Sequence, residues 1–282
     1  MTINAWPRSA RLDAPHLIDR IAEITGVRLL LEGPCPGGEV GAAYVRWPDG
    51  RRSVLTEGRS STGALVDLAR AAGVPTARYE LSAHIDGARV VVQQRLPGSP
   101  PAGLDAELVH GMITLNLRLT GLLTSYPATP AVELYLSTDG PGFCLHEPLR
   151  EHSKRCARLL DWIREVGRSA PDAAAGGDDL VHLDYHPGNI LVSAGRISGV
   201  VDWDGARRGD RRLDLVTLRF DLAWRAPHLT GPLDDRLTVM DPDRLRAYWA
   251  HMSLRQVDWS IRHHDAATVD RWLTIAETFM RR

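Results

Sequence analysis

Lysine is almost absent from this chain. Lys154 is the only lysine among 282 residues, which contain 33 arginines. A phosphate-binding site that does not include Lys154 must therefore use arginine side chains or backbone N–H groups. Acidic and basic residues nearly balance, and the formal net charge of −1 gives no overall attraction to nucleic acid or to an anionic membrane surface. We therefore expect neither nucleic acid nor a membrane as a partner.

Cysteines and long apolar stretches are also scarce. The three cysteines, Cys35, Cys144 and Cys156, are odd in number and have no metal-binding spacing. They are typical of reduced thiols rather than of a disulfide framework. No apolar run approaches the roughly 20 residues of a membrane span, and residues 1–13 contain no apolar core of signal-peptide length. These features predict a cytoplasmic protein.

The most informative segment is HLDYHPGNILVSAGRISGVVDWD, which covers residues 182–204. Asn189 follows Asp184 by five residues, and Asp202 follows Asn189 by thirteen, at the end of an apolar run. Transfer of a phosphoryl group from a nucleotide needs a carboxylate that accepts or orients the attacking hydroxyl. It also needs an oxygen-rich pair that holds Mg²⁺ against the phosphates. All three residue types are present in the order that such a site requires.

The residues between these polar groups explain how they would meet. Residues 180–183 form a short apolar run, so Asp184 is predicted where a buried strand opens into a loop. A tight turn at Pro187-Gly188 would bring Asn189 back beside Asp184. Residues 190–192 and 197–201 read as a β-hairpin that would carry Asp202 to the same end as Asn189.

A metal-dependent hydrolase is an alternative interpretation, because His182, Asp184 and His186 occupy every second position, a spacing that metal ligands can have. Zinc usually takes three or four protein ligands. The chain has no HExxH or paired CxxC motif, and the other nearby histidines have no ligand spacing. We therefore predict that His182 is a scaffold residue that hydrogen-bonds the catalytic loop.

The segments HLDYHPGN, VVDWD and RRGDRRLDL together resemble the aminoglycoside phosphotransferase family, whose members have a protein-kinase-like fold. The resemblance implies that Asp184, with His182 beside it, is the catalytic residue and that Asn189 and Asp202 bind Mg²⁺. It also implies that Asp214, in the Gly-Asp-x-x-x-Asp-Leu element, braces the catalytic loop.

Strand patterns and helix patterns fall in different parts of the chain, which agrees with two lobes. Residues 27–96 read mostly as strands with a glycine-containing loop and one helix at 60–72, and residues 97–282 read mostly as helices. Helices are predicted around 108–122, 156–166, 244–262 and 266–280, where tryptophans 249, 259 and 272 read as core residues. We predict an α+β, bilobal protein-kinase-like fold with the active cleft between the lobes. Residues 1–96 would bind nucleotide, and residues 97–282 would carry catalysis and substrate binding.

The expected nucleotide is ATP, with GTP as an open alternative. Its candidate contacts, carried over from the resemblance or from the loop pattern, are Gly37, Gly38, Arg52, Gln93, Gln94 and Arg95. One departure from the family pattern is clear: Thr56 occupies the place of the third-strand lysine that pairs with nucleotide phosphates. Arg52 or Arg59 is the candidate substitute. The chain is therefore a divergent member, and a catalytically impaired pseudokinase that sequesters its ligand remains an alternative.

The resemblance implies a basic antibiotic as the acceptor, either an aminoglycoside or a cyclic peptide of the viomycin–capreomycin type. A cationic acceptor needs carboxylates close by, and aromatic rings can stack on it. The candidate substrate residues are Asp221, Asp234, Asp235, Asp258, Trp203 and Trp224. Kinases for choline, homoserine and other small alcohols share the same motifs and stay open as alternatives. The sequence does not indicate an oligomeric state.

Overall fold

The structure is a computed structural model that describes residues 12–36, 41–58, 62–169 and 176–281. The chain forms two compact units. One contains residues up to Pro100 together with Ile190–Asp204, and the other contains Pro101–Asn189 and Gly205–Arg282. The first boundary lies close to the predicted residue 97. The hairpin that begins at Ile190 belongs to the first unit and not, as predicted, to the second, because its strands pair with Thr76 and Ser99.

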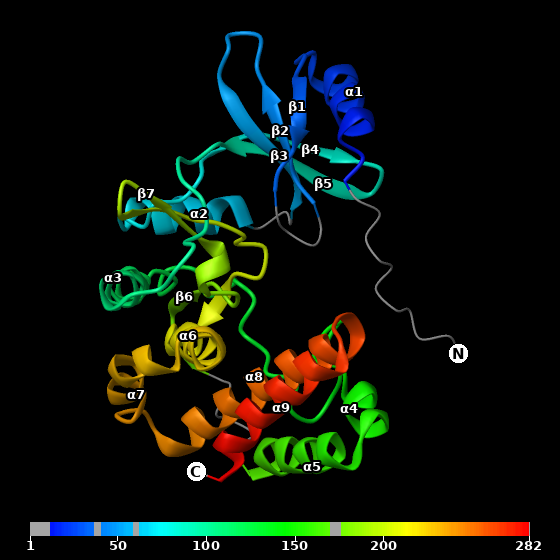
Figure 1. The fold of residues 1–282 in the computed structure, drawn as a ribbon. Helices are drawn as coiled ribbons and strands as arrows, with labels where there is room; N and C mark the ends of the chain where they lie inside the picture. The colour runs from blue at the N-terminus through cyan, green and yellow to red at the C-terminus, as the bar shows by residue number, and fades with distance from the viewer. Residues whose placement is uncertain (1–11, 37–40, 59–61, 170–175, 282) are drawn as a thin grey trace. The chain divides into compact units, whose positions relative to one another are not determined.

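The first unit is built on an antiparallel five-stranded sheet with the order β1-β2-β3-β5-β4 (Figure 1). The strands are β1 (Leu30–Pro34), β2 (Ala43–Arg46), β3 (Arg52–Gly58), β4 (Tyr79–Ile85) and β5 (Ala88–Gln94). The unit also contains helices α1 (Ala14–Thr25) and α2 (Thr62–Ala71), and a separate hairpin of β7 (Ile190–Ser193) and β8 (Arg196–Val200). The predicted hairpin is thus confirmed, with Ala194 and Gly195 both at positive φ in its turn.

The core of the first unit lies between α1 and one face of this sheet. The apolar residues Leu17, Ile18 and Ile21 recur at helical spacing along α1. They join Leu55 and Val92 of the sheet in one buried cluster. Burial of this helix face against the sheet supplies the hydrophobic stabilisation of the unit.

Two elements of the first unit were not predicted, α1 and β4. β4 is an edge strand whose residues are mostly only partly buried. Two sequence signals for it were available. Its residues YELSAHI alternate apolar and polar side chains strictly. Asp86 and Gly87, with φ of 51° and 83°, form the tight turn between β4 and β5, and Asp-Gly is a strong hairpin signature.

The second unit is mainly helical, with one small sheet of β6 (Asp179–Val181) and β9 (Arg207–Gly209). Its helices are α3 (Ala106–Leu117), α4 (His146–His152), α5 (Lys154–Ser169), α6 (Arg212–Arg225), α7 (Gly231–Leu237), α8 (Pro242–His263) and α9 (Ala266–Met280). Helix α8 packs against α4, α5 and α9, and it runs beside α9 (Figure 1). The predicted helices correspond to α3, α5, α8 and α9, whereas α4, α6 and α7 were missed.

The predicted core position is confirmed for Trp249, whereas Trp259 and Trp272 are only partly buried. Trp249 is buried and stacks on Phe279 with ring centroids 3.9 Å apart. No helix in the described part of the chain combines the length and the apolar character needed to cross a membrane.

Candidate active site

The site begins where the buried strand β6 ends. Leu180 and Val181 are fully buried and deliver His182, which is also fully buried, to the start of the loop. His182 Nδ1 accepts a hydrogen bond from the backbone N–H of Asp184 at 3.2 Å. The ring therefore holds the loop from inside, as a scaffold would.

Asp214, in the first turn of α6, clamps the same loop. Its Oδ2 accepts from the N–H of His182 and its Oδ1 from the N–H of Leu183, both at 2.8 Å. Burial raises the pKa of Asp214 to about 7, although the two N–H donors act in the opposite direction. These bonds hold Leu183 at a φ of 68°, a left-handed conformation that is unfavourable for leucine. The contacts agree with the expected bracing role.

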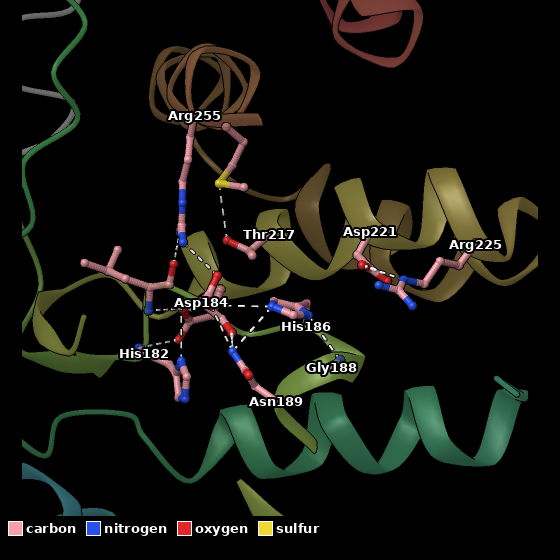
Figure 2. A network of polar contacts seen from close by, with 12 residues as sticks. His182, Asp184, His186, Gly188, Asn189, Thr217, Asp221, Arg225 and Arg255 are labelled. Carbon is pink, nitrogen blue, oxygen red and sulfur yellow. Dashed lines mark hydrogen bonds and ion pairs between the residues drawn. The ribbon is translucent and has the colours of Figure 1, made fainter. Parts of the chain in front are cut away.

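Asp184 lies at the centre of a polar network (Figure 2). Its Oδ2 accepts from Nδ2 of Asn189 at 2.9 Å and lies 3.4 Å from Nε2 of His186, while Nη2 of Arg255 donates to its Oδ1 at 2.7 Å. Burial acts to raise the pKa of this carboxyl, but Arg255 and the two nearby histidines outweigh it and hold the pKa well below the usual range. Asp184 is therefore an anion at any pH at which the protein would work.

His186 has a defined proton position in this network. Its Nδ1 accepts from the N–H of Gly188 at 3.1 Å, so the neutral ring carries its proton on Nε2, which faces Asp184. Burial acts to lower the pKa of His186, but its hydrogen bond to Asp184 and the charges of Asp184 and Asp221 raise it above the ordinary value. His186 was not among the predicted site residues, although it stands within the motif that predicted Asp184.

The turn at Pro187–Asn189 is a short 3-10 helix that returns Asn189 to Asp184, as predicted. Because Nδ2 of Asn189 donates to both the backbone and side-chain oxygens of Asp184, its carbonyl oxygen Oδ1 is the atom suited to Mg²⁺. Asp202, the second predicted ligand, follows β8 in the first unit with a φ of 63°. The donor types thus fit Mg²⁺. In the described ranges, no group of three or more His, Cys, Asp or Glu side chains is arranged to hold a metal.

Several predicted nucleotide residues gather in the first unit. Arg52, Gln94 and Arg95 line one cavity of about 380 Å³. The other lining residues are Arg51, Arg78 and Glu80. Gln93 lies one position earlier in β5, opposite Val54. Gly37, Gly38 and Arg59 lie outside the described residues.

Arg52 is a poor substitute for the missing lysine in this geometry. Its Nε donates to Oε1 of Glu32 at 3.2 Å, and more than half of its side chain is exposed. Thr56 pairs with Val91 of β5. Side chains alternate along a strand, so Thr56 faces away from the core that contains Leu55.

The structure separates the six predicted substrate residues. Asp221 of α6 is 8% exposed, and Nε of Arg225 donates to its Oδ1 at 2.9 Å. Its Oδ2 is buried and has no hydrogen-bond partner among the described residues. Its charge also acts on His186, so this acidic group belongs to the surroundings of the loop that carries Asp184. Burial raises its pKa, while Arg225 acts to lower it.

The other acidic candidates have different environments. Asp258 is fully buried, both of its oxygens accept from Arg262, and Oδ2 also accepts from the N–H of Leu145. This is the geometry of a structural ion pair and corrects the expectation of a substrate contact. Asp234 of α7 accepts from Arg219 through both oxygens, and the adjacent Asp235 is exposed.

The two aromatic candidates differ in burial, and both already pack against groups of the protein. Trp203 is 4% exposed, and its Nε1 donates to the carbonyl of Val200 at 2.9 Å. Trp224 stacks on Trp272 at 4.7 Å, and the guanidinium of Arg271 lies 4.0 Å from its ring centroid. Burial corrects the expectation of substrate stacking for Trp203. Trp224 is only partly buried, so its contact with substrate stays a prediction.

Sequence reasoning missed Arg255 altogether. It lies in α8, 71 residues beyond Asp184, and no motif marks it. Only the packing of helix α8 in the second unit brings the guanidinium to the loop.

Comparisons with known proteins place the chain in a family. Residues 45–249 match the model of the phosphotransferase enzyme family, which covers well over half of the chain. A hygromycin-B 4-O-kinase of Escherichia coli is 28% identical over 122 residues, which are 39% of this chain and 32% of that protein. The match thus spans about a third of the curated relative.

Solved structures show the same fold. A thermostable mutant of the aminoglycoside phosphotransferase APH(4)-Ia, in ternary complex with AMP-PNP and hygromycin B, has a TM-score of 0.68 at 18% identity, covering 95% of this chain and 98% of that one. A putative fructosamine-3-kinase from Haemophilus somnus has a TM-score of 0.59 at 11% identity, covering 93% and 96%. The predicted α+β, protein-kinase-like fold is confirmed. With its motifs on the loop that they predicted and a family model matched over residues 45–249, the chain belongs to the phosphotransferase enzyme family.

Proposed function

We propose that this protein transfers the γ-phosphoryl group of ATP to a hydroxyl of a basic antibiotic, and that this modification inactivates the antibiotic. The observation that supports it most is the state of Asp184: an ionised carboxylate, braced by His182 and Asp214 and in contact with Asn189. Phosphoryl transfer is catalysed mainly by positioning and by electrostatic stabilisation, and this loop is built for positioning.

Asp184 has a specific part in this proposal. An anion with so low a pKa is a weak base, so its main contribution is to accept a hydrogen bond from the acceptor hydroxyl and aim its oxygen at the phosphorus. Asn189 and Asp202 would hold Mg²⁺, which neutralises phosphate charge when it is bound.

The basic character of the acceptor is proposed from Asp221. Its buried Oδ2 lacks a hydrogen-bond partner among the described residues, and Asp221 lies close enough to the loop for its charge to act on His186. An unsatisfied buried carboxylate oxygen is costly, and a cationic group on an acceptor bound beside the loop would offset part of this cost through its charge. The likeness to a hygromycin-B kinase agrees with an aminocyclitol or aminoglycoside, and cyclic peptides of the viomycin–capreomycin type carry similar cations.

Two alternatives have an observation behind them. The similarity in fold to a putative fructosamine-3-kinase favours another hydroxyl-bearing small molecule as acceptor. Thr56 in place of the third-strand lysine favours a pseudokinase that binds and sequesters its ligand.

The deciding experiment is mass spectrometry of the purified protein with Mg²⁺ and ATP or GTP, and a pooled panel of aminoglycosides, basic cyclic peptides and small alcohols. A mass gain of one phosphoryl group on a basic antibiotic supports the proposal, and its loss in excess EDTA would show the need for a divalent cation. A gain on a small alcohol alone favours the first alternative. Ligand binding without transfer from either nucleotide favours the second.

A further inference from the structure

Arg255 connects helix α8 to the catalytic loop in two places. Its Nη2 donates to Oδ1 of Asp184 at 2.7 Å, and its Nη1 donates to the carbonyl oxygen of Leu183 (Figure 2). We infer that Arg255 is a positioning residue that sets the orientation of the Asp184 carboxylate and of the Leu183 peptide for phosphoryl transfer. This inference rests on the proposed function. It also concerns a residue beyond the family match, which ends at residue 249.

The geometry suits a clamp. A guanidinium is a rigid planar fork, so donation from two of its nitrogens fixes both acceptors relative to each other. Leu183 is then held from both sides, because Asp214 accepts from its N–H and Arg255 donates to its C=O. Opposed contacts of this kind can maintain the left-handed φ of 68°, which a leucine would otherwise leave.

The helix that carries Arg255, α8, is held in place by packing against its neighbours. Leu254, the residue before Arg255, is fully buried, and so is Met252. Oγ1 of Thr217 in α6 lies 3.4 Å from the sulfur of Met252, which ties α8 to the helix that carries Asp214. Groups held by rigid elements position a site more accurately than groups on loops.

Helix α8 also contains an ion pair with a purely structural environment. Arg262 donates to both oxygens of Asp258, which is fully buried and outside the catalytic loop. Arg255 instead contacts a carboxylate that is about a third exposed, so its partner remains open to a ligand. Arg262→Ala is therefore a matched control, since it removes the same side chain and an ion pair from the same helix.

The test compares Arg255→Ala, Arg255→Lys and Arg262→Ala in steady-state phosphoryl transfer, well below the melting temperature of each variant. Misplacing a reacting group by about 1 Å can cost roughly a hundredfold in rate. We therefore expect Arg255→Ala to lower kcat by about that factor while both KM values change by less than about threefold, and added guanidinium at non-denaturing concentration to restore part of kcat. The kcat of Arg255→Lys should stay below the kcat that Arg255→Ala reaches with added guanidinium, because one ammonium group cannot reproduce the two-pronged donor geometry of a guanidinium. Arg262→Ala should lower the melting temperature and leave kcat unchanged.

Hydrogen exchange of the amides of Leu183 and Asp184 gives a second measurement that does not need activity. Exchange should accelerate in Arg255→Ala and not in Arg262→Ala. If the wild-type protein transfers no phosphoryl group, the proposed function fails, and this exchange alone decides whether the clamp exists. Three results would each overturn the inference. The amides in Arg255→Ala could exchange at the wild-type rate, or Arg255→Ala could keep the wild-type kcat. The third is an equal loss of kcat in Arg255→Ala and Arg262→Ala.

Discussion

Thr56→Lys would restore the third-strand lysine that this chain lacks. Thr56 pairs with Val91 in the sheet. Its hydroxyl donates to the backbone carbonyl of its neighbour Glu57 at 3.0 Å, so the substitution disturbs little of the described structure. If nucleotide phosphates lie beside this strand, the new ammonium should tighten nucleotide binding.

The size of the effect follows from the surroundings. Gly58 lies two positions along β3 on the same face as Thr56, and a Cβ built on it would come 3.4 Å from Oδ1 of Asp204. The lysine would therefore enter a region that already contains a carboxylate. A charge-assisted hydrogen bond contributes about 1.5–3 kcal/mol, and ordering a lysine side chain costs up to about 2 kcal/mol. At the upper end of both ranges the difference is about 1 kcal/mol, which corresponds to nucleotide binding that is about fivefold tighter.

Calorimetric titration with Mg²⁺ and ATP measures this directly. Thr56→Gln is the uncharged control of similar length, and Glu57→Lys places an ammonium one residue away on the opposite face. We expect a lower dissociation constant for Thr56→Lys alone. If Thr56→Lys binds no more tightly than Thr56→Gln, the phosphates do not lie beside this part of β3 and the reasoning is wrong.

Three further predictions concern the second unit. Asp184→Asn should lower kcat by about a hundredfold with little change in the KM for nucleotide, because the amide orients the acceptor hydroxyl less well than the carboxylate does; unchanged turnover would remove Asp184 from the mechanism. His186 has a pKa above its unfolded value, so its stabilising contribution is present below the unfolded pKa and is lost as pH rises through the folded pKa. His186→Gln should therefore lower the melting temperature more at pH 6 than at pH 9, and an equal loss at both would contradict the assigned shift. Asp221→Asn should raise the KM for an amine-bearing acceptor by about tenfold and leave that for a neutral acceptor unchanged; equal effects on both would argue against a cation contact.

Local sequence determined the turn of the loop at Asp184 and the hairpin that follows it. Pro187-Gly188 turns the chain within a few residues, so the proximity of Asn189 to Asp184 follows from their spacing. The same holds for the hairpin around Ala194-Gly195, where the turn residues select the pairing. Helical periodicity likewise predicted α5, α8 and α9.

Other elements escaped prediction for different reasons. β4 has the alternation of a strand and an Asp-Gly turn beside it, so its signal was present and was not used. Helix α6 is buried at every position from Leu213 to Leu222, so it has no amphipathic stripe. Asp258 and Trp203 were misjudged for a related reason. The residue type does not show whether an aspartate or a tryptophan is exposed or buried, because burial depends on how the helices and strands pack.

The sequence by itself thus determined the family, the local geometry of the loop around Asp184 and the missing lysine, because each depends on residues close together in the chain. The tertiary structure decided which distant side chains complete the site. Asp214 reaches His182 from 32 residues away, and Arg255 reaches Asp184 from 71. Both arrive through the packing of α6 and α8, and no pattern within a single helix encodes which residues of another segment that helix will meet.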